Sequence, residues 1–290
     1  MMGRLLRQLL CLVLACAALA AHAKLFLWEA ERDGQKVWLL GSVHVGRADL
    51  YPLAAPIEAA YRNAGTLAVE ADITDTAAVA ALVPMTALPP GQTIPKLLTA
   101  KQNKQLDATL QRLGLSHGIA DHLKPWFLAI TLSALEMRKQ GFDADAGIDL
   151  HYLTAAKAEG KQVVELESAK SQFDLLDSLP QADGVALLAS SLGPNAEHDF
   201  KREFDRMIAA WKAGDAARMR HIIDEDSGQD AASRRVNDKL FTERNRTMAE
   251  KIATLASTPA PLVVIGAGHL AGPDSVIDLL RARGFRVTQH

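Results

Sequence analysis

Cysteine is almost missing from this chain, and no long apolar run follows its first two dozen residues. Cys11 and Cys16, its two cysteines, both lie within residues 1–23. The rest of the chain therefore has no thiol for a disulfide, a thiolate metal ligand or a cysteine nucleophile. Aromatic residues are few, at 5%, and the formal net charge is only −2. This charge gives no support for nucleic-acid binding.

The first 23 residues have the three parts of a cleavable secretory signal in order. Two arginines precede the apolar run of residues 9–20, and the small-residue site Ala21-His22-Ala23 follows. The apolar run is shorter than the about 20 residues that a membrane-spanning helix needs. We therefore predict cleavage after Ala23 and a periplasmic or secreted protein of the bacterial envelope. A lipoprotein site at Cys16 is disfavoured because Leu14 is large where a smaller residue is usual.

The remaining sequence predicts one globular domain over residues 24–290. Apolar residues at 49% and charged residues at 23% are typical of globular proteins. The pattern favours an α/β (α+β) fold with a central mixed sheet and a large helical insertion or cap. The sheet core is expected from residues 24–75, 161–167 and 261–290, and mostly helical structure from residues 76–160 and 168–260.

Local patterns place the individual elements. A hairpin is predicted across Asp33-Gly34, because this pair readily supplies the positive φ of a tight turn. Further strands are predicted at residues 66–70, 161–167, 261–265 and 285–288. Amphipathic periodicity predicts helices over residues 49–60, 99–113, 125–138, 147–159 and 273–283.

One segment occurs twice, near opposite ends of the chain. Gly41-Ser42-Val43-His44 and Gly266-Ala267-Gly268-His269 both follow an apolar strand, and an aspartate comes five residues after each histidine. Glycine lets the backbone turn sharply at the end of the strand. Each imidazole is therefore expected over the carboxyl edge of the sheet, where open α/β sheets bind ligands.

Two glutamates end other predicted strands, and with the histidines they would form a metal site. Glu70 closes residues 66–70, and Glu167 closes residues 161–167, although strand alternation places Glu165 on the same face as Glu167. His44, His269 and these carboxylates suit divalent manganese, cobalt or zinc. Such an ion lowers the pKa of its water to about 7 and polarises a carbonyl. Without a metal, one histidine would act as a general base instead.

The motifs together resemble those of the TraB/GumN (TraB/PrgY/GumN) family over nearly the whole chain after the signal. The resemblance implies a fold similar to the erythromycin-esterase and ChaN-like group, and a relationship to the Tiki proteins, metal-dependent proteases that act on secreted partners. The segments that carry it are residues 28–44, 69–70, 88–93, 124–126, 147–149, 166–167, 243–245 and 264–272.

By this resemblance, His44, His269, Glu70 and Glu167 are the metal-binding and catalytic residues. Arg244 and Asn245 match the family's Arg-Asn element, and a guanidinium fork there would bind a substrate carboxylate or phosphate. The alternative for this pair is helix packing and capping.

Other polar residues are weaker candidates. Ser42 is a substrate-binding candidate, but it lacks the Gly-x-Ser-x-Gly context of a serine nucleophile. Asp145 and Asp149 flank the helix of residues 147–159 and are predicted to be N-terminal caps or favourable dipole partners. The remaining histidines beyond the signal and before the C-terminus are predicted to be structural or solvated: His117, His122, His151, His198 and His221.

These interpretations predict an exported metal-dependent hydrolase, similar to a peptidase, that acts on a peptide or a secreted protein. One alternative is a periplasmic protein that sequesters a peptide, haem or metal without turnover. Another is a metal-independent esterase with a histidine base. No nucleic-acid partner and no stable membrane span after signal cleavage are expected.

Overall fold

The computed structural model describes residues 24–192, 196–226, 231–257 and 259–290. The predicted signal, residues 1–23, lies outside these ranges. Within them, no helix combines the length and the apolar character that crossing a membrane requires.

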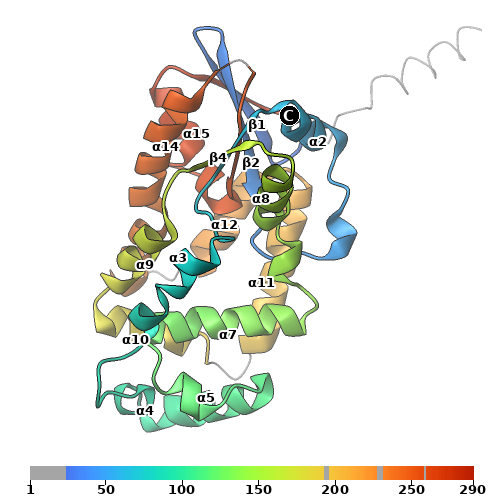
Figure 1. The fold of residues 1–290 in the computed structure, drawn as a ribbon. Helices are drawn as coiled ribbons and strands as arrows, with labels where there is room; N and C mark the ends of the chain where they lie inside the picture. Colours follow the sequence, from blue (N-terminus) through green and yellow to red (C-terminus); the bar gives the residue numbers. More distant parts are fainter. Residues whose placement is uncertain (1–23, 193–195, 227–230, 258) are drawn as a thin grey trace, which may run out of the picture.

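A six-stranded mixed sheet forms one half of the molecule (Figure 1). The strands are β1 Leu27–Arg32, β2 Gln35–Ser42, β3 Thr66–Val69, β4 Gln162–Glu165, β5 Leu262–Gly266 and β6 Arg286–Gln289. They lie in the order β4-β3-β5-β2-β1-β6. β1 is antiparallel to both of its neighbours, whereas β2, β5, β3 and β4 are mutually parallel. The carboxyl ends of four strands therefore share one edge, and the α/β class with a central mixed sheet is confirmed.

The sequence explains the β1–β2 hairpin and the burial of β5 and β6. The β1–β2 hairpin turns at Asp33 and Gly34, both with positive φ, as the Asp-Gly pair predicted. β5 is buried at all five positions, as expected of an apolar strand with parallel neighbours on both sides. β6 is one of the two edge strands, and the alternating exposure of its residues fits one solvated face.

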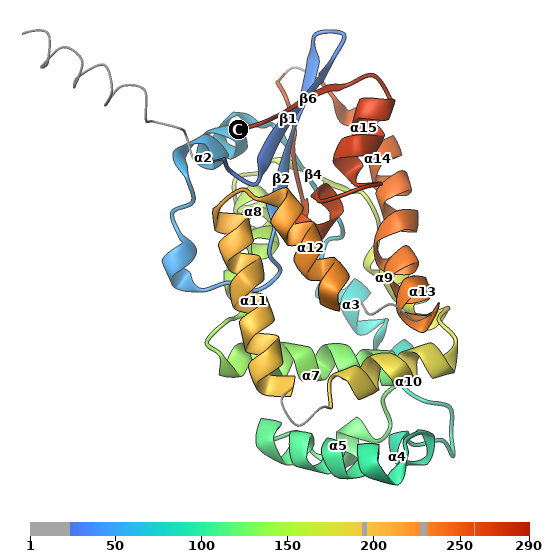
Figure 2. The same cartoon turned by 180° about the vertical axis from the view of Figure 1, so that it is seen from behind.

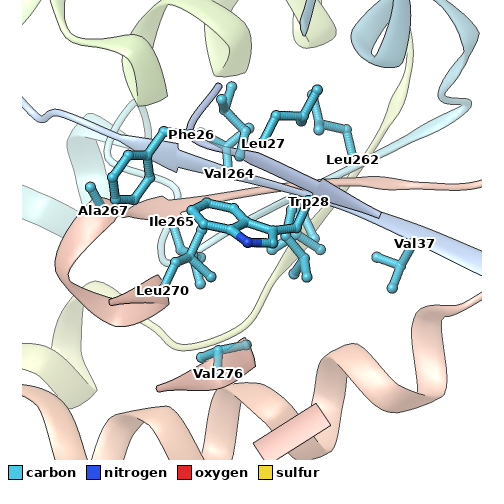
Figure 3. Close-up of a cluster of buried hydrophobic side chains, with 14 of the residues drawn as sticks. Phe26, Leu27, Trp28, Val37, Leu262, Val264, Ile265, Ala267, Leu270 and Val276 are labelled. Atoms are coloured by element: carbon cyan, nitrogen blue, oxygen red, sulfur yellow. The ribbon is translucent and has the colours of Figure 1, made fainter. Parts of the chain in front are cut away.

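Helices cover both faces of the sheet (Figures 1 and 2). α14 Glu243–Leu255 and α15 Val276–Ala282 pack together on one face. α8 Ile148–Ala158 contacts β3, β4 and β5 from the other face, beside α2 Ala55–Asn63. Figure 3 shows Trp28, Ile265 and Val276 among the apolar side chains of this core.

A second, helical part lies beyond the carboxyl edge of the sheet (Figures 1 and 2). It has its own apolar cluster, which includes Leu106, Leu132 and Leu188 from three different helices. α5 Ala100–Leu113, α7 Pro125–Lys139 and α10 Gln181–Ser190 carry this cluster. The remaining helices of the molecule are α3 Thr76–Ala80, α4 Ile94–Leu97, α6 His117–Ala120, α9 Ala169–Asp177, α11 Ala196–Lys212, α12 Ala216–Asp226 and α13 Ala231–Asn237. The short helical turns are η1 Ala48–Leu50, η2 Val83–Thr86, η3 Ala144–Ala146, the π-helical η4 Asp238–Thr242 and η5 Ala267–Leu270.

Most predicted helices occur within a few residues of the expected bounds, but the helix predicted over residues 49–60 begins later than expected. The turn η1 occupies Ala48–Leu50, and α2 begins only at Ala55. Pro52 interrupts the helical pattern, because proline has no N–H and disfavours helical geometry at the preceding residue. The strand predicted over residues 161–167 also ends early, at Glu165.

Leu132→Ala tests whether the helical cluster contributes to stability. Leu132 is 1% exposed, so the truncation should leave a cavity and lower the free energy of unfolding by about 3 kcal/mol. Ile130→Ala on the same helix is the matched control, because Ile130 is 44% exposed and its loss should cost less than about 0.5 kcal/mol. Urea denaturation followed by circular dichroism measures both; equal losses would show that Leu132 is not part of a packed core.

Candidate active site at the carboxyl edge of the sheet

The structure brings all four predicted strand-end residues to the shared carboxyl edge. Glu70 directly follows β3, Glu167 follows β4 by two residues, and His44 follows β2 by two residues. His269 lies in η5, the turn that follows β5. Their order along the edge repeats the strand order, so β5 places His269 between Glu70 and His44.

Three of these side chains converge on Gly266, the last residue of β5. A Cβ atom on Gly266 would lie 3.2 Å from Glu70 Oε1, 3.2 Å from His44 Nε2 and 3.5 Å from His269 Cδ2. The backbone N–H of Gly266 also donates a 2.7 Å hydrogen bond to Glu70 Oε1. Glycine is required here because a side chain would fill the space in which the three functional groups meet.

His269 is held with one ring nitrogen directed into this space. Asn245 Nδ2 donates to the carbonyl oxygen of Asp274 at 2.9 Å, so its Oδ1 is the amide atom that faces His269 Nδ1 at 2.7 Å. An amide oxygen only accepts hydrogen bonds, which assigns the ring proton to Nδ1. Burial lowers the pKa of His269 to about 4, so the ring is neutral at pH 7. His269 Nε2 then carries a lone pair 3.8 Å from Glu70 Oε1.

His44 is held in the same way, by a carboxylate. Its Nδ1 lies 3.1 Å from Asp149 Oδ2, and its side chain is 66% exposed. The negative charge of Asp149 raises the pKa of His44 well above its usual range. His44 is therefore protonated at neutral pH when nothing else binds Nε2, and it is poorly suited to act as a metal-free general base.

Backbone hydrogen bonds hold the loop that contains His44, residues 43–46, against the start of α8. Ile148 donates a 3.0 Å hydrogen bond to Val43, and Gly46 donates a 2.9 Å hydrogen bond to Asp143. A Cβ atom on Gly147 would lie 2.4 Å from the carbonyl oxygen of His44. Only glycine therefore lets the two loops approach closely enough for Asp149 to reach His44.

Of the two roles predicted for Asp149, helix capping was wrong, whereas a favourable partner of the helix dipole agrees with its position in the first turn of α8. The N-cap of α8 is Gly147, and no side chain forms the cap hydrogen bond. Asp149 lies in the first turn, but its carboxylate faces His44 and the hydroxyl of Ser42. Burial raises the pKa of Asp149, but these two neighbours outweigh burial and hold it below its usual value.

Arg244 joins the two strand-end glutamates. Its Nη2 donates to Glu167 Oε2 at 2.6 Å and to Glu70 Oε2 at 2.5 Å, while its Nε donates to Glu167 at 2.9 Å. Burial raises the pKa of Glu70, but its interactions with His269, His44 and Arg244 and the hydrogen bond from Gly266 hold that pKa below its usual value. The guanidinium is thus bound to carboxylates of the protein itself, rather than held open for a substrate anion.

Gln172 is a member of the site that the sequence patterns did not single out. Its Nε2 donates to Glu167 at 3.0 Å and to Glu70 at 3.2 Å, from the first turns of α9. An isolated glutamine on a helix has no distinguishing signal. Its role becomes visible only because α9 starts just after β4.

The other polar candidates lie apart from this centre. Ser42 is 2% exposed and lies against Asp149, whereas a serine nucleophile would need to face the free nitrogen of the histidine. Glu165 accepts a hydrogen bond from the backbone of Asp72 at 2.7 Å and is exposed, so Glu167 is the glutamate of this pair that enters the site. His151 stacks on Tyr51, away from the strand ends.

The donor atoms of His44, His269 and Glu70 are of the types that bind a divalent metal ion. His269 Nε2 and Glu70 Oε1 lie 3.8 Å apart, too far for a hydrogen bond, and a small approach would bring them to the about 3.4 Å that separates two ligands about 2.1 Å from a tetrahedral ion. Both histidines have their second nitrogen held by an oxygen, as metal-bound histidines almost always do. In the described part of the chain, however, no three histidine, aspartate or glutamate side chains are already gathered as a complete ligand set.

Arg244→Met tests the bridge between the glutamates. It leaves two partly buried carboxylates without their cation, so the free energy of unfolding at pH 7 should fall by about 3 kcal/mol. Arg246→Met, two residues further along α14, removes an exposed arginine and should change it by less than about 0.5 kcal/mol. Chemical denaturation of the two variants measures the difference, and similar values would rule out a structural role for the bridge.

Comparison with known proteins identifies relatives over most of the chain. A model of the TraB/PrgY/gumN family matches residues 26–289. The uncharacterized protein YbaP of Escherichia coli strain K12 is 30% identical over 270 residues, which cover 88% of this chain and 97% of YbaP. An uncharacterized protein of Treponema pallidum is 22% identical, with 93% of this chain and 84% of that protein covered.

A more distant similarity connects the chain to named enzymes. The metalloprotease TIKI1 of Danio rerio is 22% identical over 316 residues, which cover 90% of this chain and 62% of that protein. The metalloprotease TIKI2 of the same organism gives a comparable match. No solved structure gives a significant match.

Proposed function

The chain belongs to the TraB/PrgY/gumN family, and we propose that it is an exported, metal-dependent hydrolase of peptide bonds. The observation that carries this proposal is the convergence of His44 Nε2, Glu70 Oε1 and His269 on the space above Gly266. The similarity to the TIKI metalloproteases supports the same reaction class. Its substrate is a peptide or a secreted protein.

Three residues would hold the ion, which we propose to be manganese, cobalt or zinc. His44 and His269 offer their Nε2 atoms, and Glu70 offers Oε1, which lies 3.8 Å from His269 Nε2 and borders the Gly266 space beside His44 Nε2. Nitrogen and carboxylate ligands suit these metals. When bound, such an ion lowers the pKa of a water molecule to about 7 and polarises the carbonyl of the bond to be cleaved.

The surrounding residues keep these donors in place. Asp149 and Asn245 fix the second nitrogens of His44 and His269, which orients each ring. Arg244 holds Glu70 and Glu167 together and offsets their charge. In this assignment Glu167 positions Arg244, because its contacts are with Arg244 and Gln172 rather than with a histidine.

Loss of the metal after substitution of either histidine is the first test. Purified wild-type protein should bind about one manganese, cobalt or zinc ion per chain and cleave a peptide in a chelator-sensitive manner. His44→Ala and His269→Ala should each lose both properties and keep the circular dichroism of the fold.

His122→Ala is the control for this test, because His122 is exposed on the helical part and should change neither property. Full activity in either site variant would contradict the proposal. Metal uptake without any cleavage would instead indicate a protein that sequesters its ligand.

Gly266→Ala tests the space between the donors without removing any of them. Its added methyl would lie 3.2 Å from both His44 Nε2 and Glu70 Oε1, so metal affinity should fall by about tenfold or more, the scale expected when the surroundings of metal ligands are disturbed. Gly65→Ala is the matched control and should leave the metal affinity unchanged, because a Cβ atom there meets nothing within 4 Å. Isothermal titration with manganese or zinc measures both. Unchanged affinity in Gly266→Ala would place the ion elsewhere.

A further inference from the structure

A cavity of about 470 Å³ adjoins the Arg244–Glu167 end of the site. One wall is α14, which contributes Arg244, Thr247 and Lys251. The opposite wall is formed by the chain between β4 and α9 and by α9 itself (Figure 1). Leu166, Ser171 and Leu175 are on this wall.

The cavity has the length of a short peptide segment. Arg244, Thr247 and Lys251 are spaced three and four residues apart, so they lie on the same face of α14. Seven residues at 1.5 Å per residue span about 10 Å of helix. An extended peptide advances about 3.3 Å per residue, so about three residues fit beside this face.

The cavity also has one positive charge that the protein does not neutralise. Arg244 is bound by Glu70 and Glu167, and Glu243 is paired with Lys239 at 3.1 Å. Lys251 is exposed and forms no ion pair with any residue that the structure describes. A carboxylate in the cavity would therefore be attracted to Lys251.

The cavity wall also offers some apolar surface. Leu175, one helical turn beyond Ser171, is partly exposed, whereas Leu166 is fully buried beneath the wall. Aliphatic side chains gain free energy when they cover such surface. The complementary ligand is therefore a peptide segment with an aliphatic residue next to an acidic group.

The position of the cavity connects it to the proposed chemistry. Glu167 follows β4, which is two strands from β5 and the Gly266 space. Two strand spacings are about 10 Å, the length of about three extended residues. A peptide whose reacting bond lies above Gly266 can thus continue past Arg244 into the cavity.

We propose that this cavity is a substrate subsite that binds an aliphatic and acidic segment of the peptide about three residues from the cleaved bond, with the carboxylate at Lys251. The subsite deepens the proposed function and rests on it for the identity of the ligand as a substrate. The occupant is a peptide because the cavity adjoins the proposed site of peptide-bond cleavage and runs beside about 10 Å of α14, the length of about three extended residues.

Two fluorescein-labelled, amidated hexapeptides test the subsite. Both are alanine-based with one leucine, followed by glutamate in one peptide and by glutamine in the other. Fluorescence anisotropy with the purified full chain, in the presence and absence of a chelator, should show about threefold tighter binding of the glutamate peptide, the scale of an exposed ion pair. The preference should decline at about 0.5 M salt, because screening weakens such a pair.

Variants assign the preference to the cavity. Lys251→Glu should abolish it, and Lys251→Arg should retain it. Lys101→Glu makes the same charge change on α5, far from the cavity (Figure 1), and should leave it unchanged. Thr247→Trp should weaken binding of both peptides, because an indole would fill the space beside α14.

The outcomes separate this proposal from that of the hydrolase. Equal binding of the two peptides, binding of neither, or an equal loss in Lys101→Glu would overturn the subsite. Cleavage of both peptides without any preference would overturn the subsite and leave the hydrolase in place. The expected preference without metal-dependent cleavage of any peptide would support the binding site and refute the hydrolase.

Discussion

The site depends on one electrostatic constraint, the burial of two carboxylates side by side. Glu70 and Glu167 end neighbouring parallel strands, and both are largely removed from solvent. Two adjacent buried carboxylates repel each other unless a positive charge lies between them. Arg244 supplies this charge from α14, so the helix on one face of the sheet is tied electrostatically to the ends of two strands.

Two glycines make room for the other groups of the site. Gly266 leaves open the space on which both histidines and Glu70 converge, and Gly147 lets the His44 loop contact the start of α8. Each histidine is then held through its outer nitrogen by a residue from a different helix. The sheet thus sets the positions of the functional groups, and the helices on its two faces set their orientation.

Sequence patterns predicted correctly those features of the structure that depend on local geometry. The Asp33-Gly34 turn, the strand-end position of Glu70 and the two Gly-x-x-His turns were predicted from short segments, and the structure contains them. The predicted start of the helix over residues 49–60 was wrong, because Pro52 interrupts the helical periodicity and α2 begins at Ala55. The contact of Asp149 with His44 was also missed, because a carboxylate in the first turn of a helix looks the same whether it caps that helix or holds a histidine of a distant loop.

By itself, the sequence determined the types of groups available, the classes of element that carry them and membership in a family. Only the tertiary structure decided which groups meet: that Glu167 rather than Glu165 enters the site, that Gln172 joins it, and that Arg244 binds Glu70 and Glu167 of the protein itself. The physical reason is that most of these contacts join residues far apart in the chain: Arg244 lies 77 positions from Glu167 and 174 from Glu70, and Gln172 lies 102 positions from Glu70. Such contacts arise from strand order and helix packing, which periodicity and local propensity do not encode.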